Sequence, residues 1–464
     1  MLFNSFQYIV FLPAIIILYF AIPSKFRWMM LLAASYYFYM CWRVEFIVLI
    51  IISTLTDYWV GLQMVKHKEK SKRKKYLWIS LIINLGLLFS FKYFNFFSYN
   101  TELLLAEFNI FYDSPVFNVL LPVGISFYTF QTLSYTIDVY KGKAPAEKHL
   151  GYFALYVAYF PQLVAGPIER STRLLPQLKK EQKISKENFR YGINKILLGF
   201  FKKVVVADTV SIYIDEMYGH IPNGTGMQYY FVIILFGAQL FADFSGYTDI
   251  AIGSARLMGV NLMENFDKPL WSRNLSLFWS RWHISLTSWI RDYLWIPLAL
   301  RYRKAGFFIT AFILTLIGLW HGASWNFIIF GMSHGIIMGI QNRYKKIKLL
   351  KPINESKIGH IFLCLWTYNL MAFTAIFFRT KTPSDAWSVV THIFTDFRFG
   401  IEEFSSPHQT QFIISAFVSI LLIITVAFNK ALKFKYNWMY VTSMIIVIIL
   451  LGRDLKNQFI YFQF

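Results

Sequence analysis

The sequence predicts an all-α polytopic membrane protein, and three observations support this class. Of the 464 residues, 56% are hydrophobic and only 15% are charged, whereas a soluble domain carries about 25% charged residues. Apolar runs of roughly 17–25 residues, long enough to cross a bilayer core, recur along the chain. Lys and Arg gather in short segments between these runs, which is a topology signal. We predict a single membrane domain over residues 1–464, with about ten to twelve transmembrane and re-entrant helices.

The formal net charge of +21 does not indicate nucleic-acid binding. The basic residues lie between apolar spans, and no basic module rich in stacking residues is present. The two cysteines, Cys41 and Cys364, both lie in apolar runs, which excludes a disulfide framework and a Cys-based zinc site. We therefore expect no metal and no bound cofactor.

The first apolar run and the basic residues after it predict the topology. Phe6–Ala21 has no preceding positive charge and is followed by Lys25 and Arg27, so it reads as a retained helix and not as a secretory signal. Seven of the ten residues 66–75 are Lys or Arg, a strong cytoplasmic marker that is also suited to anionic lipid headgroups. Both signals place Met1 on the outer side of the membrane, opposite the cytoplasm.

Polar breaks in the later apolar runs predict broken or interfacial helices. Leu121–Gln131 contains a Pro and a Gly, which indicates a broken or re-entrant helix. Residues 170–190 are basic and weakly amphipathic, as expected for a helix and loop on the cytoplasmic surface. Residues 264–304 are rich in Trp, Arg and Tyr, which favour the headgroup zone.

Two carboxylates, Asp243 and Asp249, flank Gly246 in another apolar segment. Carboxylates at this depth are unlikely to face lipid. We expect this segment to be broken at the glycine and to line a groove or bind backbone N–H groups. Because such carboxylates can accept hydrogen bonds from backbone or Arg, we predict that both are more structural than catalytic.

The break in Gly318–Phe327 centres on His321, between two apolar segments. Such a break is tolerated in a membrane protein only where it packs in protein or lines a wet cavity. A second histidine, His283, lies within Phe278–Tyr293. Ionisable groups at membrane depth often mark functional sites, although one buried histidine is about as often a satisfied core residue. A neutral imidazole near pH 7 suits a general base.

Several motifs of this chain form a specific combination, above all Trp282-His-Ile-Ser-Leu286 with Gly318-Leu-Trp-His-Gly322. The combination resembles the membrane-bound O-acyltransferase (MBOAT) family. It is most similar to the bacterial branch of alginate and peptidoglycan O-acetylation proteins (AlgI, PatA), with the teichoic-acid D-alanylation protein DltB more distant. The matching stretches are Met1–Ser5, Leu121–Gln131, Phe160–Pro167, Phe201–Asp208, Asp243–Gly253, Phe278–Pro297, Gly318–Gly335 and Phe377–Thr380.

The resemblance implies that His321 is the catalytic histidine and His283 the second site residue. It also implies a ring of helices around a thinned centre, with a tunnel from a cytoplasmic donor side to an outward acceptor side. An acetyl group from a cytoplasmic thioester, acetyl-CoA or an acylated carrier protein, would reach an extracytoplasmic cell-wall polymer or exopolysaccharide. A secreted SGNH-type acetyltransferase or esterase is the partner we expect.

Acyl transfer to a hydroxyl needs a base for the O–H proton and donors for the developing oxyanion. His321 is the predicted base, and His283 would orient the acceptor or stabilise charge. Five further residues are candidates for lining the substrate tunnel: Trp320, Trp325, Asn326, Tyr247 and Arg291. The chain has no His-Glu-x-x-His motif, which argues against a zinc protease.

The sequence leaves two alternative hypotheses for the function. In one, the protein exports an acyl group without catalysing its transfer, and Asp57, Lys92, Asp243 and Asp249 form an ion path. No internal repeat at fixed spacing supports such a transporter. In the other, the enzyme transfers D-alanyl groups of the teichoic-acid type.

Overall fold

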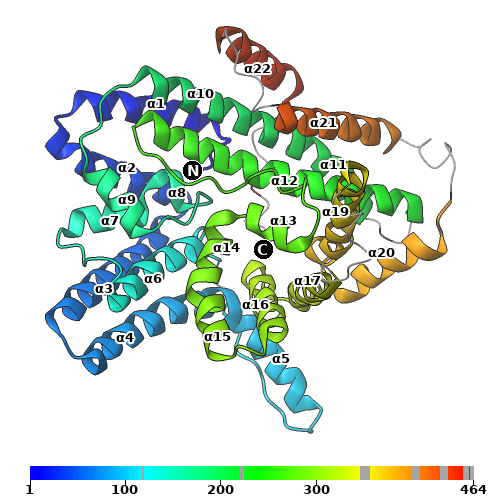
Figure 1. Ribbon diagram of the computed structural model, residues 1–464, viewed down its shortest axis with the longest axis horizontal. Helices are drawn as coiled ribbons and strands as arrows, with labels where there is room; N and C mark the ends of the chain where they lie inside the picture. Colours follow the sequence, from blue (N-terminus) through cyan, green and yellow to red (C-terminus); the bar gives the residue numbers. More distant parts are fainter. Residues whose placement is uncertain are drawn as a thin grey trace. The chain divides into compact units, whose positions relative to one another are not determined.

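The computed structural model describes residues 1–117, 120–219, 221, 224–344, 356–398, 408–428, 437–452 and 459. Within these residues the regular structure is helical and contains no β-strand (Figure 1). The prediction of an all-α membrane protein is therefore confirmed. The chain divides into two compact units. Unit 1 contains Met1–Ile193 and Ala251–Met263, and unit 2 contains Asn194–Ile250 and Glu264–Phe464.

Four helices of the described chain are long and apolar enough to cross a membrane: Val44–Lys66, Lys70–Ala106, Gly226–Leu257 and Lys357–Arg379. Four shorter apolar helices accompany them: Phe6–Ala21, Gly306–His321, Thr410–Ile424 and Trp438–Leu451. Other expected segments are divided into shorter pieces. The apolar run Phe153–Val164 forms α7 (Leu150–Ala158) and α8 (Phe160–Leu163), because Pro161 lacks the N–H that a continuous helix needs and is tolerated in a first turn.

The helix break expected inside Leu121–Gln131 lies at Gly124. Gly124 adopts a left-handed conformation, with φ of 79°, and precedes α6 (Ile125–Lys141), which runs on without interruption. A Cβ on Gly124 would lie 2.6 Å from the carbonyl oxygen of Leu163. Glycine therefore marks the entry to a helix here and does not divide one, because only a residue without a Cβ fits this backbone and this contact.

Unit 1 contains three helices that lie side by side, α3 (Ile47–Lys66), α4 (Lys70–Leu88) and α6 (Figure 1). Asp57 is buried between them and accepts hydrogen bonds from Ser80, from the Asn84 amide at 2.9 Å and from the Thr136 hydroxyl at 3.1 Å. Polar side chains that bond across helices stabilise helix association in membranes. The acceptor capacity of Asp57 is used within this cluster, which favours a structural role over the ion path considered above.

The basic connections of unit 1 lie together at one end of its helices. Arg73 donates to two backbone carbonyls at the end of α6. Lys179, at the end of α9 (Ser171–Lys179), pairs with Glu147 at 2.5 Å. Arg27, at the start of α2 (Arg27–Met40), donates to the carbonyl of Gln182 at 2.7 Å. The segments that the charge pattern assigns to one side of the membrane therefore share one end of this unit.

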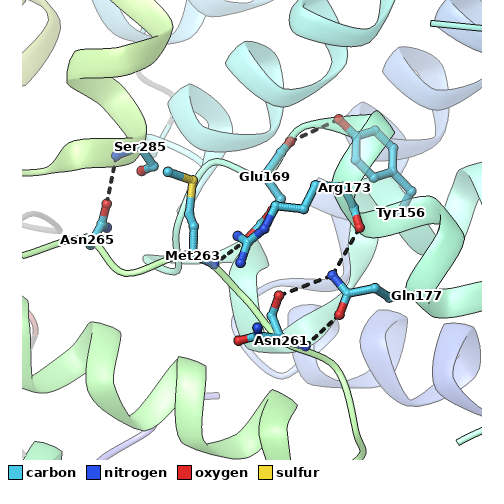
Figure 2. A network of polar contacts seen from close by, with 8 residues as sticks. All are labelled: Tyr156, Glu169, Arg173, Gln177, Asn261, Met263, Asn265 and Ser285. Carbon is cyan, nitrogen blue, oxygen red and sulfur yellow. Dashed lines mark hydrogen bonds and ion pairs between the residues drawn. The ribbon is translucent and has the colours of Figure 1, made fainter.

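In unit 1, the buried carboxylate of Glu169 binds the backbone of the segment that follows α12 (Gly226–Leu257) (Figure 2). Glu169 lies between α8 and α9, outside the helices long enough to cross a membrane. One of its oxygens pairs with Arg173 at 2.7 Å and accepts the Met263 N–H at 2.5 Å. Burial raises the pKa of the Glu169 carboxyl to about 7, although Arg173 and the Met263 amide act in the opposite direction. The neutral carboxyl is therefore appreciably populated near neutral pH.

We expect Glu169→Ala to lower the free energy of unfolding by about 1–3 kcal/mol, because it leaves the Met263 amide and Arg173 without their acceptor. Glu169→Gln keeps an acceptor of the same size and should cost less than about 1 kcal/mol. Thermal unfolding of the purified variants in detergent measures both effects. Equal destabilisation by the two substitutions would contradict the proposed role of the Met263 contact.

Candidate active site

His321 is the last residue of α16 (Gly306–His321) and is only 5% exposed. Helix α16 packs along α17 (Trp325–Tyr344), which follows it in the chain (Figure 1). The two helices approach so closely that a Cβ on Gly318 would lie 2.0 Å from the Phe327 carbonyl oxygen. The glycine of the Gly-Leu-Trp-His-Gly motif therefore permits the helix contact that places the imidazole.

Aromatic rings surround the imidazole of His321. Its centroid lies 4.9 Å from the Trp320 ring, 5.2 Å from the Phe378 ring and 6.3 Å from the Phe330 ring. Phe378 belongs to α19 (Lys357–Arg379), far along the chain. Phe377–Thr380, one of the stretches that resemble the family, thus contributes a side chain that packs against His321.

A cavity of about 40 Å³ opens beside His321. Its walls are mostly apolar, with Phe278, Trp282 and Phe378 among them. Among the lining residues other than His321, three polar atoms are buried and have no hydrogen-bond partner within the described residues: Ser272 Oγ, Trp279 Nε1 and Thr367 Oγ1. An unmade hydrogen bond in a buried place costs about 1–3 kcal/mol. These three polar groups are therefore suited to form hydrogen bonds with a bound substrate.

His283 stands between two short helices, α13 (Leu275–Arg281) and α14 (Ile284–Ile290), in a left-handed conformation with φ of 44°. This conformation costs a non-glycine residue on the order of 1–3 kcal/mol. Asn265 holds it. The Asn265 carbonyl accepts the Ile284 N–H at 2.9 Å, and its side-chain oxygen accepts the Ser285 N–H at 3.1 Å (Figure 2). Strain held in this way is typical of functional sites.

The indole of Trp320 connects the two histidines. Its ring lies 6.0 Å from the His283 ring and 4.9 Å from the His321 ring, centroid to centroid. The structure therefore brings His283 and His321 to the same aromatic side chain, although 37 residues separate them in the sequence. The cavity is lined by His321, and His283 is not among its described lining residues.

The other predicted tunnel residues lie elsewhere, and none of them is among the described lining of this cavity. Trp325 is 53% exposed, and Arg291 is 61% exposed with a 2.8 Å ion pair to the adjacent Asp292. Asn326 is buried and donates to the Thr380 carbonyl at 2.7 Å. Tyr247 stacks on the Phe459 ring at 4.6 Å. Their assignment to a substrate tunnel stays a prediction.

A third buried histidine, His334, was not among the site residues predicted from the sequence. His334 on α17 is fully buried, and its Nε2 lies 2.6 Å from the Thr374 hydroxyl. Its ring lies 4.5 Å from Phe330, which also contacts His321, and 5.6 Å from Trp279. The available signal was another ionisable residue inside an apolar run. Asn265 and Trp279 carried no such signal.

The carboxylates of α12 form buried ion pairs. Asp243 pairs with Lys203 at 2.5 Å, and Lys203 also pairs with Asp208 at 2.9 Å. Asp249 pairs with Lys202 at 2.7 Å and with Lys195 at 2.9 Å. The partners of both aspartates are lysines, where the sequence predicted backbone N–H groups or Arg, and neither aspartate is in the described lining of the cavity.

The predicted break at Gly246 is wrong, because α12 runs unbroken from Gly226 to Leu257. Gly246 instead faces Gly199 of α10 (Lys186–Phe200), and a Cβ on either glycine would lie within 2.8 Å of the other's carbonyl oxygen. The glycine serves the close approach of two helices, which sequence alone does not distinguish from a break. No group of three or more His, Cys, Asp or Glu residues suited to a metal ion occurs in the described chain.

The apolar helices and the buried histidine beside a cavity define the protein as a polytopic helical membrane protein with a candidate site at His321. The chain belongs to the membrane-bound O-acyltransferase family, MBOAT, whose family model matches residues 148–380. This match contains both His283 and His321. The protein is therefore an O-acyltransferase.

The chain is similar to curated bacterial members of the family. The "Probable alginate O-acetylase AlgI" of Azotobacter vinelandii is 34% identical over 90% of this chain and 82% of that protein. The "Peptidoglycan O-acetyltransferase" of Helicobacter pylori is 31% identical over 84% of this chain and 79% of that protein. The "Teichoic acid D-alanyltransferase" of Bacillus subtilis is 29% identical over 58% of this chain and 71% of that protein.

We expect Asp249→Asn to lower folded yield and the unfolding temperature, because it leaves Lys202 buried without its counter-charge. Removing one partner of a buried pair costs about 3–5 kcal/mol. Activity should fall only in proportion to the amount of folded protein. Asp292→Asn, which removes an exposed pair, is the control and should cost under about 1 kcal/mol. Well-folded Asp249→Asn protein whose specific activity is lost by orders of magnitude would instead identify a catalytic carboxylate.

Proposed function

We propose that this enzyme O-acetylates a cell-wall polymer or exopolysaccharide outside the cytoplasmic membrane, using an acetyl thioester from the cytoplasm. The observation that carries the proposal is His321 at the wall of a small apolar cavity whose few polar atoms include unpaired donors. The two O-acetylating relatives named above match the chain over most of its length, which supports acetyl as the transferred group.

In the reaction, His321 accepts the proton of an acceptor hydroxyl while its oxygen attacks the thioester carbonyl. An ester C–O bond forms, the C–S bond breaks, and the imidazolium returns the proton to the leaving thiolate. No covalent intermediate on the enzyme is needed. The Trp279 N–H lines the same cavity and is our candidate donor to the oxyanion that develops on the carbonyl.

The cavity favours acetyl over D-alanyl transfer. A D-alanyl group carries an ammonium, whose burial is costly unless an anionic partner is present. The described lining contains no carboxylate, and its volume of about 40 Å³ suits a short acyl group. An assay of purified protein with acetyl and D-alanyl thioesters separates the two.

A transporter without catalysis is less well supported. Asp57 is held by hydroxyl and amide donors, and Asp243 and Asp249 by lysines. Side chains engaged in this way stabilise the protein and offer no open carboxylates for an ion path.

The proposed setting is the bacterial inner membrane, with Met1 outside and the basic end of unit 1 in the cytoplasm. The positive-inside rule supports this orientation. Acetyl-CoA or an acylated carrier protein would supply the acetyl group. A secreted SGNH-type protein would pass it to the polymer if the polymer does not receive it directly.

We expect Trp279→Phe to lower kcat on the order of 10²-fold, which is the usual effect of removing one hydrogen-bond donor to an oxyanion. The phenylalanine ring should still fill the space of the indole. Trp387→Phe, on the exposed face of α20 (Pro383–Thr395), is the matched control and should leave activity unchanged. The measurement is the rate of acetyl transfer by protein of verified fold. An unchanged rate in Trp279→Phe would remove the indole N–H from the mechanism.

We expect His321→Ala to reduce acetyl transfer by about 10²–10⁴-fold, the usual contribution of a general base, with normal insertion and thermal stability. His283→Ala should be less severe, because orienting a group is easier to replace than moving a proton. The exposed His360 on α19 supplies the control His360→Ala. Polymer acetylation in cells and transfer by the purified variants are the readouts. Near-normal transfer by well-folded His321→Ala would overturn the mechanism, whereas activity lost in step with stability would make the histidine structural.

A further inference from the structure

Unit 1 contains a second cavity, of about 160 Å³, which shares no lining residue with the cavity beside His321. It lies between the connection from α1 (Phe6–Ala21) to α2 and the chain at the end of α9. Its lining includes four cationic side chains, Lys25, Arg27, Lys179 and Lys180. The first two and the last two come from segments about 150 residues apart, so the fold, and not a local run of lysines, creates this concentration of charge.

The positive charge of this cavity is only partly compensated. Glu181 is the one carboxylate in its described lining, and Glu147 lies outside the lining and pairs with Lys179. Arg27 donates to two backbone carbonyls, those of Ile22 and Gln182, at 3.1 and 2.7 Å. A carbonyl carries no net charge, so the charge of the guanidinium remains. Within the described chain, no ion pair joins Lys25 or Lys180 to a carboxylate.

Aromatic rings hold two of the cations in place. The Arg27 guanidinium lies 5.0 Å from the centroid of the Tyr19 ring, and the Lys179 ammonium lies 5.8 Å from that of Tyr152. Trp28 packs beside Tyr152 at 5.6 Å. Cation–π contacts orient a cation without neutralising it. The cavity therefore presents ordered positive charge, as an anion-binding site requires.

The position of the cavity fits a phosphate at the membrane surface. It lies where α1 ends and α2 begins, at the polar end of two apolar helices. Phe26, Met29 and Leu150, which are close in sequence to its lining residues, are exposed apolar side chains. Trp and Tyr at such a level are typical of the interface between headgroups and acyl chains.

We propose that this cavity binds a phosphate ester. Two sources carry that chemistry: the headgroup of an anionic phospholipid and the diphosphate of a soluble nucleotide thioester such as a CoA derivative. This site is separate from the His321 cavity, and the proposal does not depend on which polymer or acyl group the enzyme uses.

The test measures binding to the purified full-length protein, without any assay of activity. Phosphatidylglycerol, phosphatidylcholine and CoA are the probes, with lipid retention followed by native mass spectrometry and CoA binding by calorimetry. Lys25→Ala/Lys180→Ala removes two cations from the cavity, and Lys25→Arg/Lys180→Arg keeps them. Lys74→Ala/Lys75→Ala removes the same charge from exposed positions in the basic 66–75 segment and is the matched control.

A lysine beside an anionic group contributes about fivefold in affinity, so the double alanine variant should bind its ligand about 25-fold more weakly. The arginine variant and the control should change affinity by less than about threefold. A selective loss of phosphatidylglycerol, with phosphatidylcholine unchanged, identifies the lipid headgroup. A selective loss of CoA identifies the soluble diphosphate. If neither affinity falls, or if the control falls equally, the proposal is wrong. Because no acyl transfer is measured, that failure would leave the role of His321 untouched.

Discussion

Buried polar groups in an apolar protein must find their partners inside the protein, and the rest of this structure depends on that constraint. The buried aspartates of this protein meet this constraint. Asp57 is enclosed by side-chain donors from two neighbouring helices, and Asp243 and Asp249 by lysines of unit 2. These clusters tie helices together. They also consume the charges that a transport path would need.

The site beside His321 departs from this rule. The Ser272 hydroxyl, the Trp279 indole N–H and the Thr367 hydroxyl line a cavity, are buried and have no partner in the described chain. Around Asp57 similar groups hold helices together, whereas these three groups line a cavity that a ligand can enter. In a low-dielectric environment such donors interact strongly with charge that develops during a reaction.

Backbone geometry supplies the second element of the site. His321 depends on the close contact of α16 with α17, which only a glycine at position 318 permits. His283 depends on a left-handed backbone that Asn265 holds through two hydrogen bonds. Trp320 then contacts both imidazoles. Each histidine is thus positioned by a residue with no chemistry of its own, and such residues are difficult to recognise from composition.

The sequence by itself determined the class of the protein and its candidate site residues. The apolar runs and the placement of Lys and Arg gave a helical membrane protein, because bilayer thickness and charge leave a direct record along the chain. His321 and His283 were visible as ionisable groups at polar breaks, and the motifs around them carried the family. Only the tertiary structure decided which side chains share a cavity with His321, that Gly246 serves helix packing, and that Lys25 and Lys180 face one pocket. The physical reason is that periodicity defines the faces of a single element, whereas these sites join segments that are far apart in the chain and meet only when the helices pack.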